Sequence, residues 1–139
     1  MWRYIIMWAP VIVWMSVIFF FSSRHSVSVS SEYIWNFVFF KTLHVIEYAV
    51  LFILATRAVY QTRWTSIVDS VYARAYLITV LYAITDELHQ YFVPSRTPQP
   101  RDVIIDAIGA GLVWIYLSTQ LPKAPRILKY WVNRLGMPS

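Results

Sequence analysis

The chain has no cysteine, only three glycines and few charges: 14% of its 139 residues are Asp, Glu, Lys or Arg. Without cysteine, disulfides, thiolate metal ligands and thiol nucleophiles are excluded. Soluble domains carry about 25% charged and 45 to 50% apolar residues, whereas 58% of this chain is apolar and its mean hydropathy is +0.51. A chain of this length has room for one domain. We therefore expect a single integral membrane domain over residues 1–139.

Four apolar stretches are long enough to cross a bilayer, which predicts an all-α membrane protein with four transmembrane helices in a bundle. The first, residues 4–21, would measure about 27 Å as a helix, close to the roughly 30 Å hydrocarbon core, and it is too long for the apolar region of a cleaved signal peptide. The expected spans are residues 4–21, 41–58, 74–93 and 102–121.

Two further segments have amphipathic patterns. Residues 27–40 begin polar and end apolar, which predicts a short interfacial segment before the second span. Residues 125–135 place apolar side chains at helical spacing among basic ones, which predicts a basic amphipathic helix on the inner membrane surface. A disordered tail is the alternative, because isolated helices this short are marginal.

The basic residues predict the orientation of the spans. Eight of the 12 Lys and Arg residues lie before the first span, in the loop between the second and third or at the span ends next to it, or after the fourth. By the positive-inside rule, both termini are expected in the cytoplasm. The net charge of +5 then reflects membrane orientation and gives no reason to expect nucleic-acid binding.

Acidic residues gather on the opposite, outer half, which holds six of the seven Asp and Glu residues. Lys41, His44 and Glu47 follow one another at steps of three, so they share a ridge of the second span. The corresponding sets are Asp86, Glu87 and Gln90 in the third span and Asp102 and Asp106 in the fourth, with Ser22 and Ser23 at the same level of the first. Charges within spans are costly and usually functional. The pattern predicts one polar pocket open to the exterior.

Small residues follow in the fourth span, where Ala107, Gly109, Ala110 and Gly111 form a patch without bulky side chains. Such patches let two membrane helices approach closely. We expect the fourth span to pack tightly against a neighbour here.

These motifs resemble the VanZ-like family of small bacterial membrane proteins over about residues 16–118. The residues that carry the resemblance are Phe21-Ser22-Ser23, Lys41-x-x-His44-x-x-Glu47-Tyr48-x-x-Leu51, Asp86-Glu87-x-x-Gln90-x-Phe92-x-Pro94-x-Arg96 and Asp102-x-x-x-Asp106-x-x-Gly109. Ser95, Arg24 and Asp106 depart from the residues common in the family. The resemblance implies a multi-pass protein of the bacterial cell membrane with four helices, in a family whose founding member is linked to teicoplanin resistance. It implies no particular reaction.

One hypothesis is an enzyme that acts on a lipid-linked phosphate or glycolipid headgroup at the outer leaflet. The candidate catalytic residues are His44, Glu47, Asp86 and Glu87, and the candidate headgroup-binding residues are Ser22, Ser23, Lys41, Gln90, Arg96 and Asp102. Arg96 and Lys41 would hold an anion. Carboxylates suit Mg, Ca or Mn, and the candidate ligands are Glu47, Asp86, Glu87, Asp102 and Asp106.

Two other functions fit the same residues. In one, the pocket is a non-catalytic binder that sequesters a lipid or a lipoglycopeptide. In the other, the acids of the spans form a structural ion-pair network with Lys41, Arg96 or Arg101 that fixes the bundle. Separately, Lys41, Arg24 and Arg101 can be read as snorkelling anchors and His89 as an interfacial residue at headgroup level. The sequence leaves the choice between enzyme, binder and structural protein open, together with the oligomeric state.

Overall fold

The computed structural model describes residues 2–23, 33–63, 67–94 and 99–138, and within these ranges the chain is helical without strands. The elements are α1 (Trp2–Ser22), α2 (Tyr33–Gln61), α3 (Val68–Gln90), α4 (Pro100–Thr119), the 3-10 turn η1 (Leu121–Lys123) and α5 (Arg126–Arg134). The predicted all-α class is confirmed.

Three helical stretches are long and apolar enough to cross a membrane: Trp2–Ser22, Ile34–Gln61 and Pro100–Lys123. The chain is therefore a multi-pass membrane protein. Helix α3, the expected third span, is not among them because four charged residues, Asp69, Arg74, Asp86 and Glu87, interrupt its apolar sequence. The count of four spans stays a prediction.

Helix α2 is longer than the expected second span and runs without a break for 29 residues. The prediction of a separate interfacial segment before this span is wrong for residues 33–40, which form the first turns of α2. No proline or glycine lies between Tyr33 and Lys41 to end a helix, so nothing in the sequence separates the two parts. The earlier part of the predicted segment, residues 27–32, lies outside the described residues.

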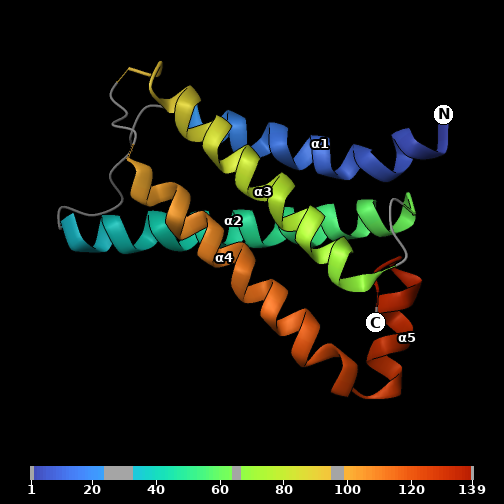
Figure 1. The fold of residues 1–139 in the computed structure, drawn as a ribbon. Helices are drawn as coiled ribbons and strands as arrows, with labels where there is room; N and C mark the ends of the chain where they lie inside the picture. Colours follow the sequence, from blue (N-terminus) through green and yellow to red (C-terminus); the bar gives the residue numbers. More distant parts are fainter. Residues whose placement is uncertain (1, 24–32, 64–66, 95–98, 139) are drawn as a thin grey trace.

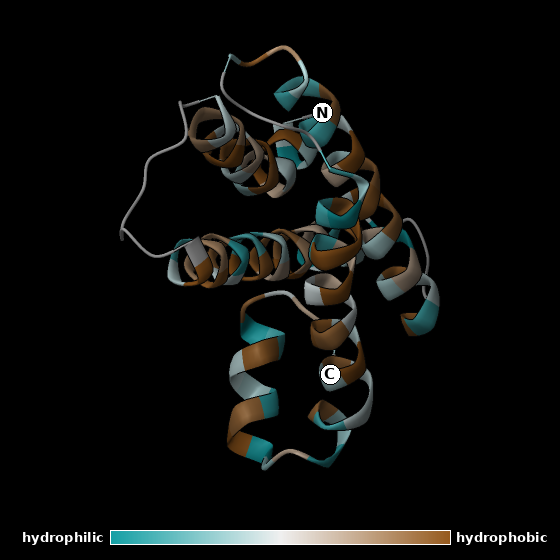
Figure 2. Ribbon diagram, turned by 90° about the vertical axis from the view of Figure 1, so that its left-hand side faces the viewer, coloured by the Kyte–Doolittle hydropathy of each residue, from teal (hydrophilic) through white to brown (hydrophobic). Residues whose placement is uncertain are grey.

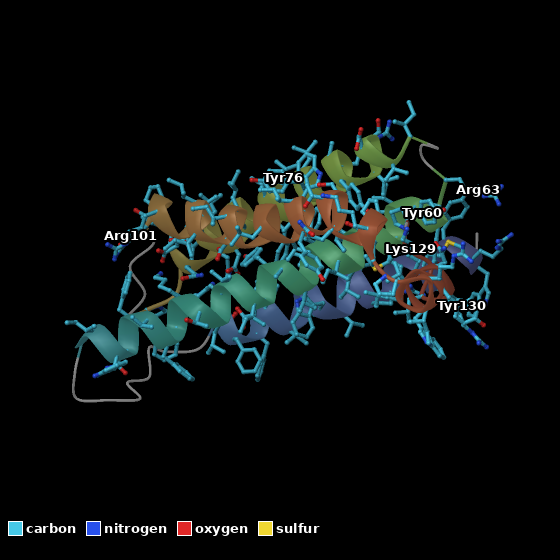
Figure 3. The ribbon with its side chains drawn as sticks, turned by 90° about the horizontal axis from the view of Figure 1, so that it is seen from below. Tyr60, Arg63, Tyr76, Arg101, Lys129 and Tyr130 are labelled. Carbon is cyan, nitrogen blue, oxygen red and sulfur yellow. The ribbon has the colours of Figure 1, made fainter. Side chains whose placement is uncertain are left out.

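The helices form a bundle with two chemically different ends. The contacts between α2 and α4 follow the same order along both helices: Lys41 meets Asp102, and further along each helix Val45 meets Gly109. The two helices are therefore parallel, and α1 and α3 run the opposite way (Figure 1). We call the end where α2 and α4 begin the acidic end, and the other the basic end. Figure 3 shows Arg101 at the acidic end, with Arg63 and Lys129 at the basic end.

Apolar side chains fill the space between the helices and also cover much of the outside. One buried cluster includes Phe52, Tyr72, Ala110 and Leu117 from α2, α3 and α4, and a second includes Val11 and Leu51. Hydrophobic residues predominate along the helices (Figure 2). On α3 the exposed leucine and isoleucine residues form a single stripe at helical spacing, Leu77, Leu81, Ile84 and Leu88. Exposed apolar faces of this extent are expected where lipid replaces water around the bundle.

Gly109 sets the close approach of α4 to α2. A Cβ atom placed on Gly109 would lie 2.9 Å from the carbonyl oxygen of Val45 and 3.1 Å from its Cα. A Cβ atom on Gly111 would lie 3.8 Å from the nearest atom, on the ring of Tyr76, which is an ordinary contact. The predicted tight packing at the small-residue patch is confirmed at Gly109.

Helix α5 ends at a glycine and turns back onto the bundle. Gly136 has a φ of +79°, and the amides of Gly136 and Met137 bond to the carbonyls of Asn133 and Val132, which is the Schellman arrangement of a helix end. The Leu135 carbonyl accepts a hydrogen bond of 2.9 Å from Arg57 of α2. This contact fixes the C-terminal segment at the basic end. Placement of α5 on the membrane surface stays a prediction.

Candidate functional site

An ion pair between two helices marks the opening of the acidic end. The Lys41 Nζ of α2 lies 2.5 Å from the Asp102 Oδ2 of α4, and both side chains are less than one fifth exposed. Arg101 Nε lies 3.8 Å from the other carboxylate oxygen, but its side chain is half exposed. The Lys41 charge is thus already balanced by Asp102 and is not free to hold an anion alone.

One turn deeper, His44 lies between two carboxylates. Its Nδ1 is 3.7 Å from Asp106 Oδ1 on α4 and 4.0 Å from Glu47 Oε2 on its own helix. His44 and Glu47 keep about one fifth of their side chains exposed, whereas only 4% of the Asp106 side chain is exposed. The histidine thus lies within ion-pairing distance of both acids, and its side chain remains partly exposed at the acidic end.

Asp86 of α3 is held by two donors from different helices. Ser22 Oγ at the end of α1 donates a hydrogen bond of 2.8 Å to Asp86 Oδ2, and Gln90 Nε2 one turn away donates one of 3.1 Å to the same oxygen. All three residues are at most 5% exposed. The structure therefore joins two residues predicted to bind a headgroup, Ser22 and Gln90, to a predicted catalytic carboxylate.

Tyr48, which was not among the predicted site residues, lies at the centre of this group. It is fully buried, and the carboxylates of Asp86 and Asp106 are close enough to act electrostatically on its hydroxyl. The spacing could have indicated it, because Tyr48 lies one turn after His44 and directly after Glu47. A tyrosine in an apolar helix is ordinarily counted with the hydrophobic residues, and so this signal was missed.

Two of the predicted residues have local structural partners instead. The Glu87 Oε1 accepts a hydrogen bond from the backbone amide of Gln99, the residue that precedes α4. Glu87 thus ties the end of α3 to the start of α4. Ser23 donates to the Phe19 carbonyl at 2.7 Å, and its oxygen lies 3.0 Å from His89 Nε2. The contact between Ser23 and His89 joins the end of α1 to the end of α3.

Four residues at this end have a buried polar atom that makes no hydrogen bond. Within the described ranges, no hydrogen-bond partner is found for the buried Tyr48 hydroxyl or for Oδ1 of Asp86, Asp102 and Asp106. Leaving such a group unsatisfied costs about 1 to 3 kcal/mol. The contact from Asp106 Oδ1 to His44, at 3.7 Å, is too long for a hydrogen bond. We call Tyr48, Asp86, Asp102 and Asp106 the buried polar cluster.

The other predictions for this end have a mixed outcome. Arg96, the predicted anion ligand, and Arg24 lie outside the described residues. Among the residues that the structure describes, no three His, Asp or Glu side chains are grouped so that they could hold a metal ion. The predicted metal ligands Glu47, Asp86, Glu87, Asp102 and Asp106 therefore form no such group among the described residues, and we assign no metal to them.

Comparison with known proteins gives one match. The family model of VanZ/LLP1 matches residues 7–120 of the chain, which include every residue of the site described above. No curated protein and no solved structure matches the chain.

Proposed function

The chain belongs to the VanZ/LLP1 family, and from that premise we propose that the acidic end binds a lipid or glycolipid headgroup at the outer leaflet. The family is one of membrane proteins associated with antibiotic resistance. Headgroup binding goes beyond this assignment. The observation that carries it is the buried polar cluster, whose four unsatisfied atoms lie close to partly exposed polar side chains of the same end, among them Lys41 and His44.

The chemistry of the cluster selects the kind of headgroup. Three of its unsatisfied atoms are carboxylate oxygens, which accept hydrogen bonds, and the fourth is a phenol, which both donates and accepts. By sequence this half of the protein holds six acidic and four basic residues, and Lys41 is paired with Asp102. A group rich in hydroxyl donors, such as a sugar or glycerol, satisfies these acceptors better than a phosphate does.

The headgroup proposal includes a four-span topology with the acidic end outside. Because α2 and α4 are parallel, the chain must cross back between them, and α3 is the described element that joins the two ends. The exposed stripe from Leu77 to Leu88 gives α3 an apolar face toward lipid, while Asp86 points to Ser22 inside the bundle. The basic residues then favour the cytoplasm for the opposite end and for both termini.

A lipid-binding measurement tests the proposal. We expect diglucosyldiacylglycerol to raise the melting temperature of the purified protein in a detergent without a sugar headgroup, because a ligand that binds only the folded state stabilises it. Phosphatidylcholine, which lacks hydroxyl donors, should stabilise less. Asp106→Asn should weaken glycolipid binding by about tenfold or more, which corresponds to losing one charge-assisted hydrogen bond.

The control is the same substitution at the one acidic residue of the other half, Asp69→Asn, which should leave glycolipid binding unchanged. Equal stabilisation by the two lipids, or equal effects of the two Asn variants, would contradict headgroup binding at the acidic end. It would favour the structural alternative, in which the charges serve only to hold the helices together.

Hydrolysis or transfer on the bound headgroup is the second candidate, and the position of His44 between Glu47 and Asp106 favours it. A histidine next to carboxylates can act as general acid or base. Incubation with glycolipid followed by mass spectrometry of the headgroup should then show a product with the wild type and none with His44→Ala. Binding without any product assigns the pocket to a non-catalytic binder that sequesters lipid or lipoglycopeptide.

A further inference from the structure

A polar cavity lies at the basic end, far from the buried polar cluster. Its volume is about 480 Å³, within the range of about 300 to 1,000 Å³ that is usual for small-molecule sites. It is formed where α1 begins and α2 ends, and its lining residues are Arg3, Tyr4, Met7, Gln61, Thr62 and Arg63. Gln61 also approaches the Leu135 carbonyl, so the C-terminal segment lies beside the cavity.

The lining carries positive charge without an acidic residue. Arg3 lies in the first turn of α1 and Arg63 in the turn that follows α2, and guanidinium groups bind phosphate oxygens through paired N–H donors. The first turn of α1 adds backbone N–H groups at the positive end of the helix dipole. Arg63 is held at a φ of 53°, a conformation that is uncommon for residues other than glycine and that clusters at binding sites. These features favour an anion.

An apolar groove begins where the polar cavity ends. The groove has a volume of about 440 Å³ and runs along the surface of α1, lined by Tyr4, Ile5, Trp8, Ala9, Ile12 and Val13. Tyr4 lines both the cavity and the groove. From Tyr4 to Val13 the groove extends about 13 Å along the helix axis, toward the middle of α1. A ligand that fills both spaces must carry an anionic group at one end and an apolar chain at the other.

We infer that the cavity and the groove together bind one anionic phospholipid, with its phosphate between Arg3 and Arg63 and an acyl chain along α1. The positive charge of the cavity favours an anionic headgroup. The apolar groove along a membrane-spanning helix favours an acyl chain. The basic end faces the cytoplasm in the proposed topology, and anionic lipids are attracted to basic pockets on that side. The lipid is a ligand of the inner leaflet and is independent of the site at the acidic end.

Thermal unfolding in neutral detergent tests this site. In the Asp106→Asn background, which weakens the site at the acidic end for hydroxyl-rich headgroups, phosphatidylglycerol should raise the melting temperature of the full chain more than phosphatidylcholine does, because the phosphatidylglycerol headgroup carries a net negative charge. The double variant R3Q/R63Q should weaken phosphatidylglycerol binding about tenfold or more and so abolish the preference. Arg126→Gln removes one exposed arginine of α5 that does not line the cavity, and it should keep the preference.

A second pair of variants tests the groove. Ala9→Phe places a ring in the groove and should weaken phosphatidylglycerol binding about tenfold, whereas Ile6→Phe, on an exposed part of α1 outside the groove, should not. Soluble glycerol 1-phosphate should fail to stabilise the protein. The assignment is overturned if the two lipids stabilise equally, if R126Q acts like R3Q/R63Q, if Ile6→Phe acts like Ala9→Phe, or if glycerol 1-phosphate matches the lipid, which would make the cavity a site for free phosphate.

Discussion

Ser22 closes the end of α1 onto a buried carboxylate of another helix, Asp86, which is 2% exposed. Ser22→Ala removes one of the two donors to this carboxylate, and it should lower the free energy of unfolding by about 1 to 3 kcal/mol. Denaturant unfolding of the purified protein in detergent measures this loss in the free energy of unfolding. Ser16→Ala is the matched control, because Ser16 bonds only to Ile12 of its own helix at an exposed position, and it should change stability by less than about 0.5 kcal/mol. Equal losses of stability in Ser22→Ala and Ser16→Ala would contradict a stabilising role of the hydrogen bond from Ser22 to Asp86.

At the residue scale, helical spacing predicted most members of the site, because residues three or four apart share a face of a helix. It correctly grouped Asp86 with Gln90. It could not show that Ser22 would be the partner of Asp86 or that Glu87 would bond to Gln99, since both contacts depend on how different helices meet. It also missed Tyr48, whose role depends on its surroundings rather than on its residue type.

The pair of α2 and α4 depends on a single glycine at their closest point. Gly109→Ala would push a methyl group against the backbone of Val45, which cannot move without shifting the helix. We expect a loss of about 1 to 3 kcal/mol, typical of overpacking. Unfolding in detergent should show it as a lower melting temperature, with weaker binding at the adjacent acidic end.

Gly111→Ala supplies the control on the same helix. Its methyl group would meet only the Tyr76 ring at an ordinary distance, and alanine favours the helix over glycine by up to about 1 kcal/mol. We therefore expect unchanged or slightly higher stability. A larger loss for Gly111→Ala than for Gly109→Ala would contradict the packing seen between α2 and α4.

At the scale of elements, the length of the apolar stretches predicted where the helices lie. It did not show which side chains of a helix face the bundle and which face outward. Helix α3 is the instructive case, because Asp86 faces the bundle while a stripe of leucine and isoleucine faces outward on the same part of the helix. An average along the sequence merges the two faces and hides the difference. At the start of α2 the sequence suggested a boundary that the structure does not have. The change from polar to apolar residues predicted a separate segment, but the helix continues through residues 33–40.

The arrangement of the whole molecule predicts which loops are accessible from outside the cell. Because the chain has no cysteine, Ser95→Cys and Ser66→Cys each introduce one reactive thiol. In intact cells an impermeant thiol reagent should label Ser95→Cys and leave Ser66→Cys unlabelled until the membrane is broken. Labelling of both in intact cells, or of neither, would place residues 66 and 95 on one side and contradict a membrane-spanning α3.

Across the whole molecule, the separation of charges is the feature that sequence and structure share. The predicted gathering of acids at one level became the buried polar cluster of α2, α3 and α4, in which Asp102 pairs with Lys41 and Asp86 accepts a hydrogen bond from Ser22 of α1. The cavity between α1 and α2 at the basic end had no signature in the sequence, because its arginines are 60 residues apart and meet only through the antiparallel packing of these helices.

The effect of Tyr48→Phe on stability and binding tests the central claim, that the buried polar cluster is kept for a ligand. The variant removes a buried hydroxyl without a hydrogen-bond partner, so the free energy of unfolding without ligand should stay the same or rise, while glycolipid affinity should fall about tenfold. Tyr82→Phe is the control, because the Tyr82 hydroxyl donates to the Met15 carbonyl at 2.6 Å and its loss should lower stability. A clear loss of stability in Tyr48→Phe with unchanged glycolipid affinity would contradict the claim.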